Sequence, residues 1–149
     1  MSLEPAQPID DPRRQLGGRY RLDRQIARGG MAEVWLGFDT FLNRQVAVKL
    51  LKPQLVSDPV VAERFRREAI VCAGLSHPNI VAVYDMVEDE GRQAVVMQYV
   101  QGKSLRELLD RRKRLGPLLT IHMGAAMAAA LDVSHRAGLV HRDVKPGNI

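Results

Sequence analysis

The most concentrated polar chemistry in the chain lies in HRDVKPGN, residues 141–148. An aspartate such as Asp143 can accept the proton of an attacking hydroxyl group, and a lysine such as Lys145 can neutralise charge on a transferring phosphoryl group. Asn148 can offer its amide oxygen to a metal ion. The same string could be a turn held by Asx hydrogen bonds to the backbone. The residue types therefore indicate phosphoryl transfer, with a structural turn as the alternative.

A second group of charged residues lies far upstream. Lys49, in VAVKLL, stands among apolar residues of a predicted strand, where an unpaired ammonium group would be costly to bury. Glu68, in RFRREAI, lies on a predicted helix that should pack against the same sheet. A pair between Lys49 and Glu68 would aim the ammonium group at a ligand phosphate. Glu68 could instead pair with Arg64 one helical turn earlier, and these residues alone favour neither arrangement.

The stretch ARGGMAEV, residues 27–34, predicts a glycine-bearing hairpin turn. Small residues in such a turn allow backbone N–H groups to approach a phosphate. A plain hairpin explains the stretch as well. No Gly-Lys-Ser/Thr follows and no helix follows, so it is neither a Walker loop nor a Rossmann turn.

The residues around these two motifs predict an antiparallel sheet. Loosely alternating apolar residues indicate five strands, at residues 20–26, 33–39, 45–51, 80–87 and 93–100. Asp58 followed by Pro59 is a typical helix start, and this helix should extend to about residue 74. We therefore expect a five-stranded sheet with one helix inserted after its third strand. A polar, proline-bearing leader at residues 1–17 is expected to be disordered.

The C-terminal part is predicted to be helical. Ser104 and Glu107 form a capping box for LRELLDRRKRL, and a longer helix is expected at about residues 118–137, closed by Gly138. Its stretch MGAAMAAALDV is apolar on almost all sides, which indicates a helix inside a protein.

Six pieces of the chain, in order, resemble the eukaryotic-type (Hanks-type) Ser/Thr protein kinases of bacteria. They are ARGGMAEV, VAVK, the helix with RRE, HPNIV, MQYV and HRDVKPGN. The resemblance covers about residues 18–149 and implies an α+β fold. A kinase small lobe with the hinge would occupy residues 18–100, and part of a mostly helical large lobe would occupy residues 101–149.

The resemblance implies ATP and Mg²⁺ as cofactors and protein Ser/Thr hydroxyls as substrates. Lys49 would hold the α- and β-phosphates and Glu68 would hold Lys49. Asp143 would orient the substrate hydroxyl as catalytic base, Lys145 would support the γ-phosphate, and Asn148 would bind Mg²⁺.

The resemblance also implies the adenine and phosphate contacts. Gly29 and Gly30 would let the loop cover the phosphates, and the backbone of residues 98–100 would bind the adenine edge. His141 would brace the catalytic loop. The implied cofactor-binding residues are Ala27, Gly29, Gly30, Val34, Ala47, Lys49, Met97, Gln98 and Val100.

Two departures from the family pattern stand out. Ala27 and Ala32 occupy the outer glycine positions of the family's G-x-G-x-x-G loop, and alanine would cost ~1–2 kcal/mol at a left-handed position. The Asp-Phe-Gly segment, with the family's principal Mg²⁺ ligand, and the activation loop would follow Ile149. We therefore expect a kinase truncated after its catalytic loop, which alone would be inactive or weakly active.

Truncation would leave the long apolar helix uncovered. We expect Met123, Met127 and Leu131 to form exposed apolar surface, with a tendency to self-associate.

Composition narrows the class of protein. Apolar residues make up 46% and charged residues 26%, as in an ordinary soluble globular protein. Cys72 is the single cysteine, so no intrachain disulfide can form, which fits a reducing cytosol. No run of 18 apolar residues predicts a transmembrane helix. We expect a cytoplasmic kinase domain, whose full-length parent could carry a membrane anchor.

The chain has a formal net charge of +5, and its densest basic run is RRKR at residues 111–114. A solvated helix end explains this run, because cations suit the negative end of a helix dipole. No nucleic-acid partner is expected, since aromatic residues do not interleave the cations.

A function of a different class stays open. The chain could be a nucleotide-binding or protein-interaction module that does not transfer phosphate. Asp143 favours the enzyme, because a binding module has no need of it, whereas the expected truncation favours the module.

Overall fold

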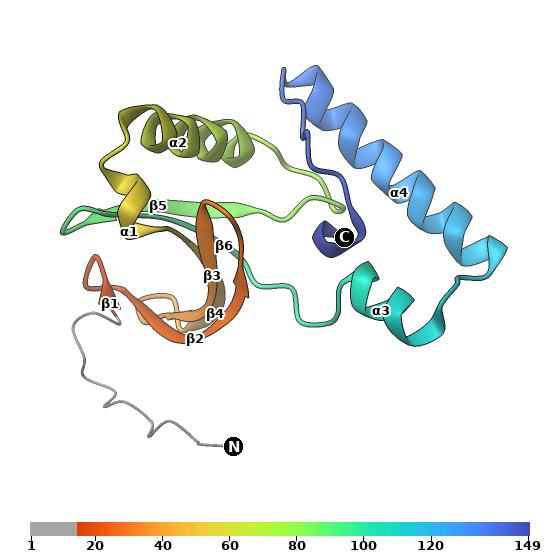
Figure 1. Cartoon of the computed structure of the whole chain (residues 1–149), viewed down its shortest axis with the longest axis horizontal. Coiled ribbons are helices and arrows are strands. Elements are labelled where there is room, and N and C mark those ends of the chain that lie inside the picture. The colour runs from red at the N-terminus through yellow and green to blue at the C-terminus, as the bar shows by residue number, and fades with distance from the viewer. Residues whose placement is uncertain (1–14) are drawn as a thin grey trace. The chain divides into compact units, whose positions relative to one another are not determined.

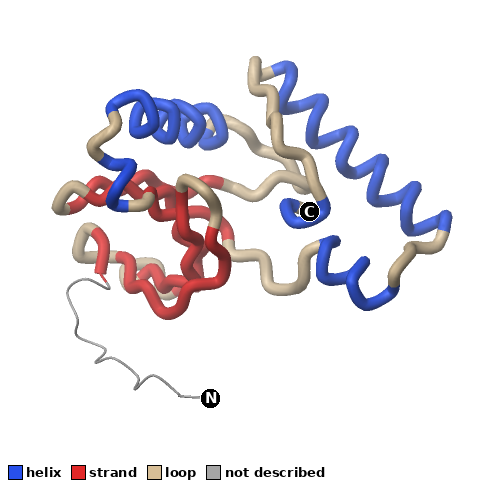
Figure 2. Tube along the Cα trace, in the orientation of Figure 1, coloured by secondary structure: helices blue, strands red, loops and turns tan. Residues whose placement is uncertain are grey.

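The computed structural model describes residues 15–149, so residues 1–14 of the predicted leader lie outside the described part. The described chain divides into two compact units. The first contains the residues up to Ala69 together with Val83–Tyr99, and the second contains Ile70–Ala82 and Val100–Ile149. All the strands belong to the first unit (Figures 1 and 2). The α+β class predicted from the sequence is confirmed.

The first unit is built on an antiparallel sheet with the strand order β1-β2-β3-β4-β6-β5. Five strands match the prediction, although β5 begins three residues later than expected. The extra strand, β1, takes two residues that were assigned to the leader, because the Leu16 side chain is fully buried in the core. The strands are β1 (Gln15–Leu16), β2 (Tyr20–Arg28), β3 (Ala32–Asp39), β4 (Arg44–Leu51), β5 (Val83–Asp89) and β6 (Arg92–Gln98).

Each face of this sheet carries its own hydrophobic cluster, and β4 contributes to both. Val46 and Val48 belong to one cluster, and both are fully buried. Leu51 belongs to the other cluster and is 1% exposed. Because successive side chains of a strand point to opposite faces, the sequence VAVKLL serves both clusters at once.

Two helices follow β4 in the chain. The short helix α1 (Pro53–Val56) was not predicted. Helix α2 (Pro59–Ala73) was predicted, and Asp58 Oδ1 accepts hydrogen bonds from the N–H groups of residues 60 and 61 at 3.0 and 3.3 Å. Phe65 and Ala69 of α2 are buried in the cluster that contains Leu51, so the helix covers that face of the sheet.

The second unit contains α3 (Leu105–Arg112), α4 (Pro117–Arg136) and the 3₁₀ turn η2 (Pro146–Asn148). The predicted capping box of Ser104 and Glu107 is confirmed. Gly138 has a φ of +79°, and its N–H donates to His135 O at 2.9 Å just after α4 ends. The left-handed glycine therefore ends the helix as predicted.

The long helix α4 does not expose the three residues that were expected to be uncovered. Met123, Met127 and Leu131 are half-buried and line a groove of about 430 Å³ with residues of the 70–82 and 139–149 segments. Asn79 Nδ2 donates to Ala126 O at 3.1 Å and so holds the first of these segments against the helix. The exposed apolar side chains of α4 lie elsewhere, at Leu118, Leu119 and Ile121.

Among the described helices, α4 alone is long and apolar enough to cross a membrane. A search for 18 consecutive apolar residues does not detect this helix. The core helix of a soluble protein passes the same test, so this is weak evidence for a membrane span.

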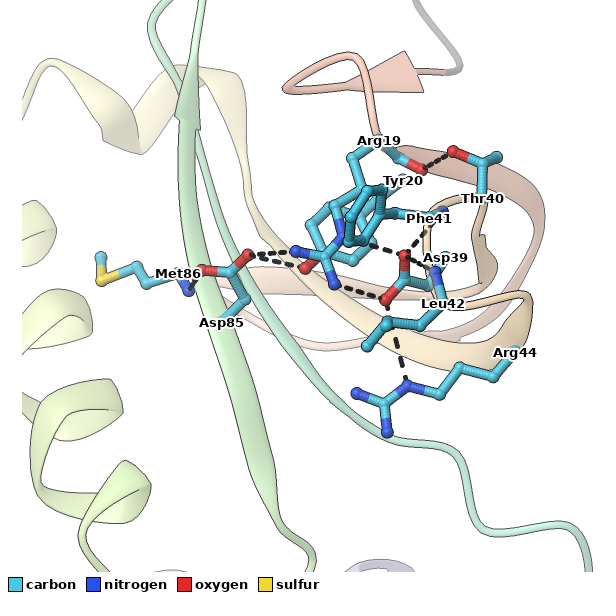
Figure 3. A network of polar contacts seen from close by, with 9 residues as sticks. All are labelled: Arg19, Tyr20, Asp39, Thr40, Phe41, Leu42, Arg44, Asp85 and Met86. Atoms are coloured by element: carbon cyan, nitrogen blue, oxygen red, sulfur yellow. Dashed lines mark hydrogen bonds and ion pairs between the residues drawn. The ribbon is translucent and has the colours of Figure 1, made fainter.

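A buried carboxylate fixes the turn between β3 and β4. Asp39 is 1% exposed and accepts two hydrogen bonds from the Arg19 guanidinium, at 2.9 and 2.8 Å (Figure 3). Asp39 Oδ1 also accepts the N–H groups of Phe41 and Leu42, each at 3.1 Å. The hydrogen bonds from Arg19 hold the pKa of Asp39 well below its usual range, against the opposing effect of burial.

Loss of this carboxylate should destabilise the first unit. We expect Asp39→Asn to lower the free energy of unfolding at neutral pH by about 2 kcal/mol. Because the folded state depresses the pKa of Asp39, its contribution is present above the unfolded value of about 3.9 and is lost as the pH falls through both values. Urea unfolding at neutral and acid pH, followed by the fluorescence of Trp35, measures both effects.

The matched control is Asp110→Asn, because Asp110 pairs with Arg106 at an exposed position of α3. An exposed pair of this kind contributes about 0.5 kcal/mol. Equal losses of stability in the two variants would contradict the role assigned to Asp39.

Candidate functional site

The glycine-bearing hairpin joins β2 to β3 and is held by backbone bonds. The Gly29 N–H donates to Ala32 O at 2.8 Å, and Met31 O accepts the Lys52 N–H at 3.0 Å. Neither Gly29 nor Gly30 has a positive φ, and a Cβ at Gly30 would meet open space. The turn therefore has small side chains, but its backbone does not require the left-handed conformation that favours glycine.

The two alanines at the outer glycine positions carry no backbone strain. Ala27 and Ala32 lie in β2 and β3, and neither has a positive φ. The cost anticipated for a left-handed alanine does not arise. Ala32 is 5% exposed and packs in the core cluster with Leu51 and Phe65, so its methyl group stabilises the base of the hairpin.

The strand register brings four of the predicted site residues to one face of the sheet. Val34 lies opposite Lys49, and Ala47 lies opposite Met97. Ala47 and Lys49 are two residues apart on β4, so their side chains share a face. This face also carries Leu51 and the cluster that α2 covers. The sheet thus places a lysine beside small and apolar side chains on one face.

The ammonium group of Lys49 lies 5.8 Å from the centre of the Phe65 ring of α2. Glu68, three residues further along the helix, is exposed, and within residues 15–149 it forms no ion pair with Lys49 or with Arg64. Neither of the two pairings weighed from the sequence is formed. The aromatic ring makes a cation–π contact with the ammonium group. An ion pair with a carboxylate would be a stronger interaction.

The other predicted adenine contacts, Gln98 and Val100, lie at the end of β6 and just after it. Gln98 ends β6 and lies opposite Val46. Val100 is 60% exposed and belongs to the second unit. Their predicted roles use backbone groups, so they depend on the course of the chain and little on the side chains.

The catalytic-loop motif of the second unit forms a compact polar network. Lys145 Nζ lies 2.9 Å from Asp143 Oδ2, and Asn148 Nδ2 donates to the same oxygen at 3.2 Å and to Asp143 O at 2.9 Å. The Asp143 N–H donates to His141 Nδ1 at 3.2 Å. Asp143, Lys145 and Asn148 are thus brought together in one loop, and His141 contacts the backbone of Asp143.

Electrostatics keep the Asp143 carboxyl ionised. The hydrogen bond from Lys145 is the main cause that lowers its pKa, and the Asn148 hydrogen bond and the nearby His141 act in the same direction. Both side-chain contacts use Oδ2, so Oδ1 accepts no hydrogen bond from the described residues. One carboxylate oxygen therefore remains available to a hydroxyl group.

Two features that sequence reasoning missed hold this loop. Arg142 has a φ of +63° and forms a bend in the chain just before Asp143. The Leu105 N–H, at the start of α3, donates to Ile149 O at 2.7 Å. A backbone bond between residues so far apart in the chain leaves no signal in the side-chain pattern, and a non-glycine residue gives little sign of a positive φ.

Asn148 fits a role as metal ligand. Its amide nitrogen is bonded to Asp143, which leaves the amide oxygen, a donor type that Mg²⁺ accepts, without that engagement. No group of three or more His, Cys, Asp or Glu side chains in the described part of the chain could hold a metal ion. Asn148 would therefore be one ligand of a set that includes phosphate oxygens and water.

Known proteins resemble the chain strongly. Residues 20–149 match the family model of the protein kinase domain. A probable serine/threonine-protein kinase of Streptomyces coelicolor is 52% identical over 95% of the chain, which spans 21% of that protein. The serine/threonine-protein kinase PknA of Mycobacterium tuberculosis is 50% identical over 90% of the chain, which spans 32% of that protein.

Solved structures agree with the sequence comparison. The crystal structure of the PknI kinase domain of Mycobacterium tuberculosis aligns with a TM-score of 0.74 and 34% identity, over 90% of this chain and 54% of that one. The chain belongs to the protein kinase domain family. Its curated relatives are bacterial Ser/Thr protein kinases, and it spans about a fifth to a third of their length.

The Asp143–Lys145 contact makes a prediction that needs no activity. We expect Lys145→Met to raise the pKa of Asp143 toward its ordinary value, because Lys145 supplies the largest lowering effect. Asn148→Ala should raise the pKa less. Carboxyl-carbon NMR titration of the chain measures both shifts, and the same pKa for Asp143 in all three proteins would contradict the network.

Proposed function

We propose that the chain carries the ATP-binding and catalytic-loop portions of a protein kinase that transfers the γ-phosphoryl group of ATP to Ser/Thr hydroxyls of proteins. The observation that supports this most is the Asp143–Lys145–Asn148 network, in which three side chains with distinct tasks in phosphoryl transfer meet in one loop. The family membership of the chain supports the same reaction.

The proposal assigns the binding of ATP to the sheet face of the first unit. Lys49 binds the α- and β-phosphates, and the hairpin with Gly29 and Gly30 covers them. The small side chain of Ala47, 7% exposed, leaves room for the adenine ring against β4. The remaining proposed contacts are Ala27, Val34, Met97, Gln98 and Val100.

Glu68 acts by holding Lys49 in this proposal. Protein kinases require such a Lys–Glu pair for transfer. Because Lys49 lies over Phe65 instead, nucleotide binding must be accompanied by a movement of the Glu68 side chain or of α2 that brings the carboxylate to the ammonium group.

In the transfer step, the free Oδ1 of Asp143 accepts the hydrogen bond of the substrate hydroxyl. As the bond between the hydroxyl oxygen and the γ-phosphorus forms, the bond between the γ-phosphorus and the β–γ bridging oxygen breaks, ADP leaves, and Asp143 takes the hydroxyl proton. The ammonium group of Lys145 leaves the Asp143 carboxylate and contacts the γ-phosphate. There it neutralises the negative charge of the phosphoryl group that is transferred. Mg²⁺ bound at Asn148 would neutralise phosphate charge. A carboxylate of low pKa suits this task, because the loose transition state needs orientation of the hydroxyl more than early proton removal.

A second candidate is a nucleotide-binding or protein-interaction module without phosphoryl transfer. The unformed Lys49–Glu68 pair favours it, because a module that only binds has no need of that pair.

For the whole protein we propose the same transfer reaction, with proteins as substrates and partners. We also propose a cytoplasmic location for this domain and a tendency to self-associate.

Nucleotide titration of the chain, for example by calorimetry, tests the binding role. We expect Lys49→Met to weaken ATP binding about tenfold or more, because it removes a charged hydrogen-bond donor from the phosphates. Asp143→Asn should change the affinity by less than about threefold, since Asp143 serves the hydroxyl group. Equal ATP affinity in the wild type and Lys49→Met would overturn the assignment.

Phosphate incorporation into a generic basic protein separates the two candidates. Transfer that Asp143→Asn reduces by about 100-fold or more supports the kinase. Lys49-dependent binding of ATP without any Asp143-dependent transfer supports the module.

A further inference from the structure

The last turn of α3 and the connection that follows it carry positive charge that the proposed phosphoryl transfer does not use. Within residues 15–149, four consecutive cations there are exposed and form no ion pair: Arg111, Arg112, Lys113 and Arg114. The neighbouring carboxylate of Asp110 is already paired with Arg106 at 2.6 Å. The positive charge is therefore locally uncompensated, which goes beyond the solvated helix end expected from the sequence.

Exposed aliphatic side chains follow these cations directly. Leu118 is 77% exposed and Ile121 is 67% exposed, in the first turns of α4. Residues three apart on a helix lie on one face, so these two side chains are neighbours. Leu119 between them is 39% exposed. Single exposed apolar residues are ordinary, but a cluster beside a basic run marks an interaction surface.

Each group is held by a local hydrogen bond at one end of the connection. Lys113 has a φ of +66°, and its N–H donates to Leu109 O at 2.7 Å, which ends α3. Thr120 Oγ1 donates to Gly116 O at 3.0 Å at the start of α4. Arg112 and Arg114 border one shallow hollow with residues 115–117. Figure 1 shows how short the connection between α3 and α4 is.

We propose that this α3–α4 corner, residues 111–121, docks on the anionic surface of a phospholipid bilayer. Cations attract the phosphate-bearing headgroups, and aliphatic side chains beside them enter the boundary between headgroups and acyl chains. A nucleic acid would use the cations but would leave Leu118 and Ile121 in water, and the corner offers no aromatic ring on which bases could stack. The combination of charge and aliphatic surface favours the bilayer.

Vesicle flotation of the whole chain tests the proposal. We expect binding to vesicles of phosphatidylglycerol and phosphatidylcholine in equal parts, and none to phosphatidylcholine alone. Each cation near an anionic surface contributes roughly fivefold, so the double variant Arg112→Gln, Arg114→Gln should lose roughly 25-fold. Leu118→Ser with Ile121→Ser should lose about tenfold, because the apolar contribution is removed.

Matched controls come from exposed residues of α2. Arg64→Gln with Arg66→Gln removes the same charge, and Val60→Ser removes an aliphatic side chain that is 68% exposed. These variants should keep the binding of the wild type.

Equal losses in the corner variants and the controls would overturn the proposal. Wild-type binding that does not depend on lipid charge would also overturn it, and this comparison needs no variant to fold. Retention on duplex DNA that is lost in the arginine variant, without any vesicle binding, would overturn it in favour of a nucleic acid. None of these measurements uses nucleotide, so their outcome is independent of the proposed phosphoryl transfer.

Discussion

Burial of β4 on both of its faces is the constraint on which the first unit depends. Val46 and Val48 are removed from water on one face and Leu51 on the other, and each such side chain stabilises the fold by about 1.5–3 kcal/mol. Because β4 pairs with β3 and β6, the same strand sets the register of both neighbours. Lys49 is carried on this strand between Val48 and Leu50, so its position is as firmly determined as that of the core.

The two lysines of the candidate site are held in different ways. Lys145 already lies 2.9 Å from its carboxylate partner, within a loop that hydrogen bonds among residues 141–148 hold together. Lys49 contacts an aromatic ring and has no described carboxylate partner. The proposed catalytic loop is thus preorganised, whereas the proposed ATP-binding face requires one further adjustment. This difference matters because phosphoryl transfer depends mainly on positioning and electrostatic stabilisation.

The apolar side chains of α4, in the second unit, lie in two different environments. One stripe of α4 lines a groove with the 70–82 and 139–149 segments, while Leu118 and Ile121 stand in water next to four cations. The hydropathy of α4 alone does not distinguish these faces, since the helix is apolar on almost all sides. The interaction surface proposed at the α3–α4 corner follows from exposure and unpaired charge together.

The sequence by itself determined the elements and the chemistry. Period-two alternation predicts the strands, Asp58, Ser104 and Gly138 mark helix ends through local hydrogen bonds or a positive φ, and HRDVKPGN brings its own residues together within eight positions. These are local properties, because each depends on neighbours a few residues away. The order of six such local motifs along the chain carries the resemblance to the kinase family, and that resemblance selects the residues of the candidate site.

Only the tertiary structure decided which distant groups meet. It placed Phe65 rather than Glu68 beside Lys49 and buried Ala32 at the base of the hairpin. It also gave Leu16 to the sheet and left Met123 half-buried and Leu118 exposed. Each of these placements depends on residues that lie far away in the sequence. The outcome therefore depends on how whole elements pack, which a local pattern of residues does not specify.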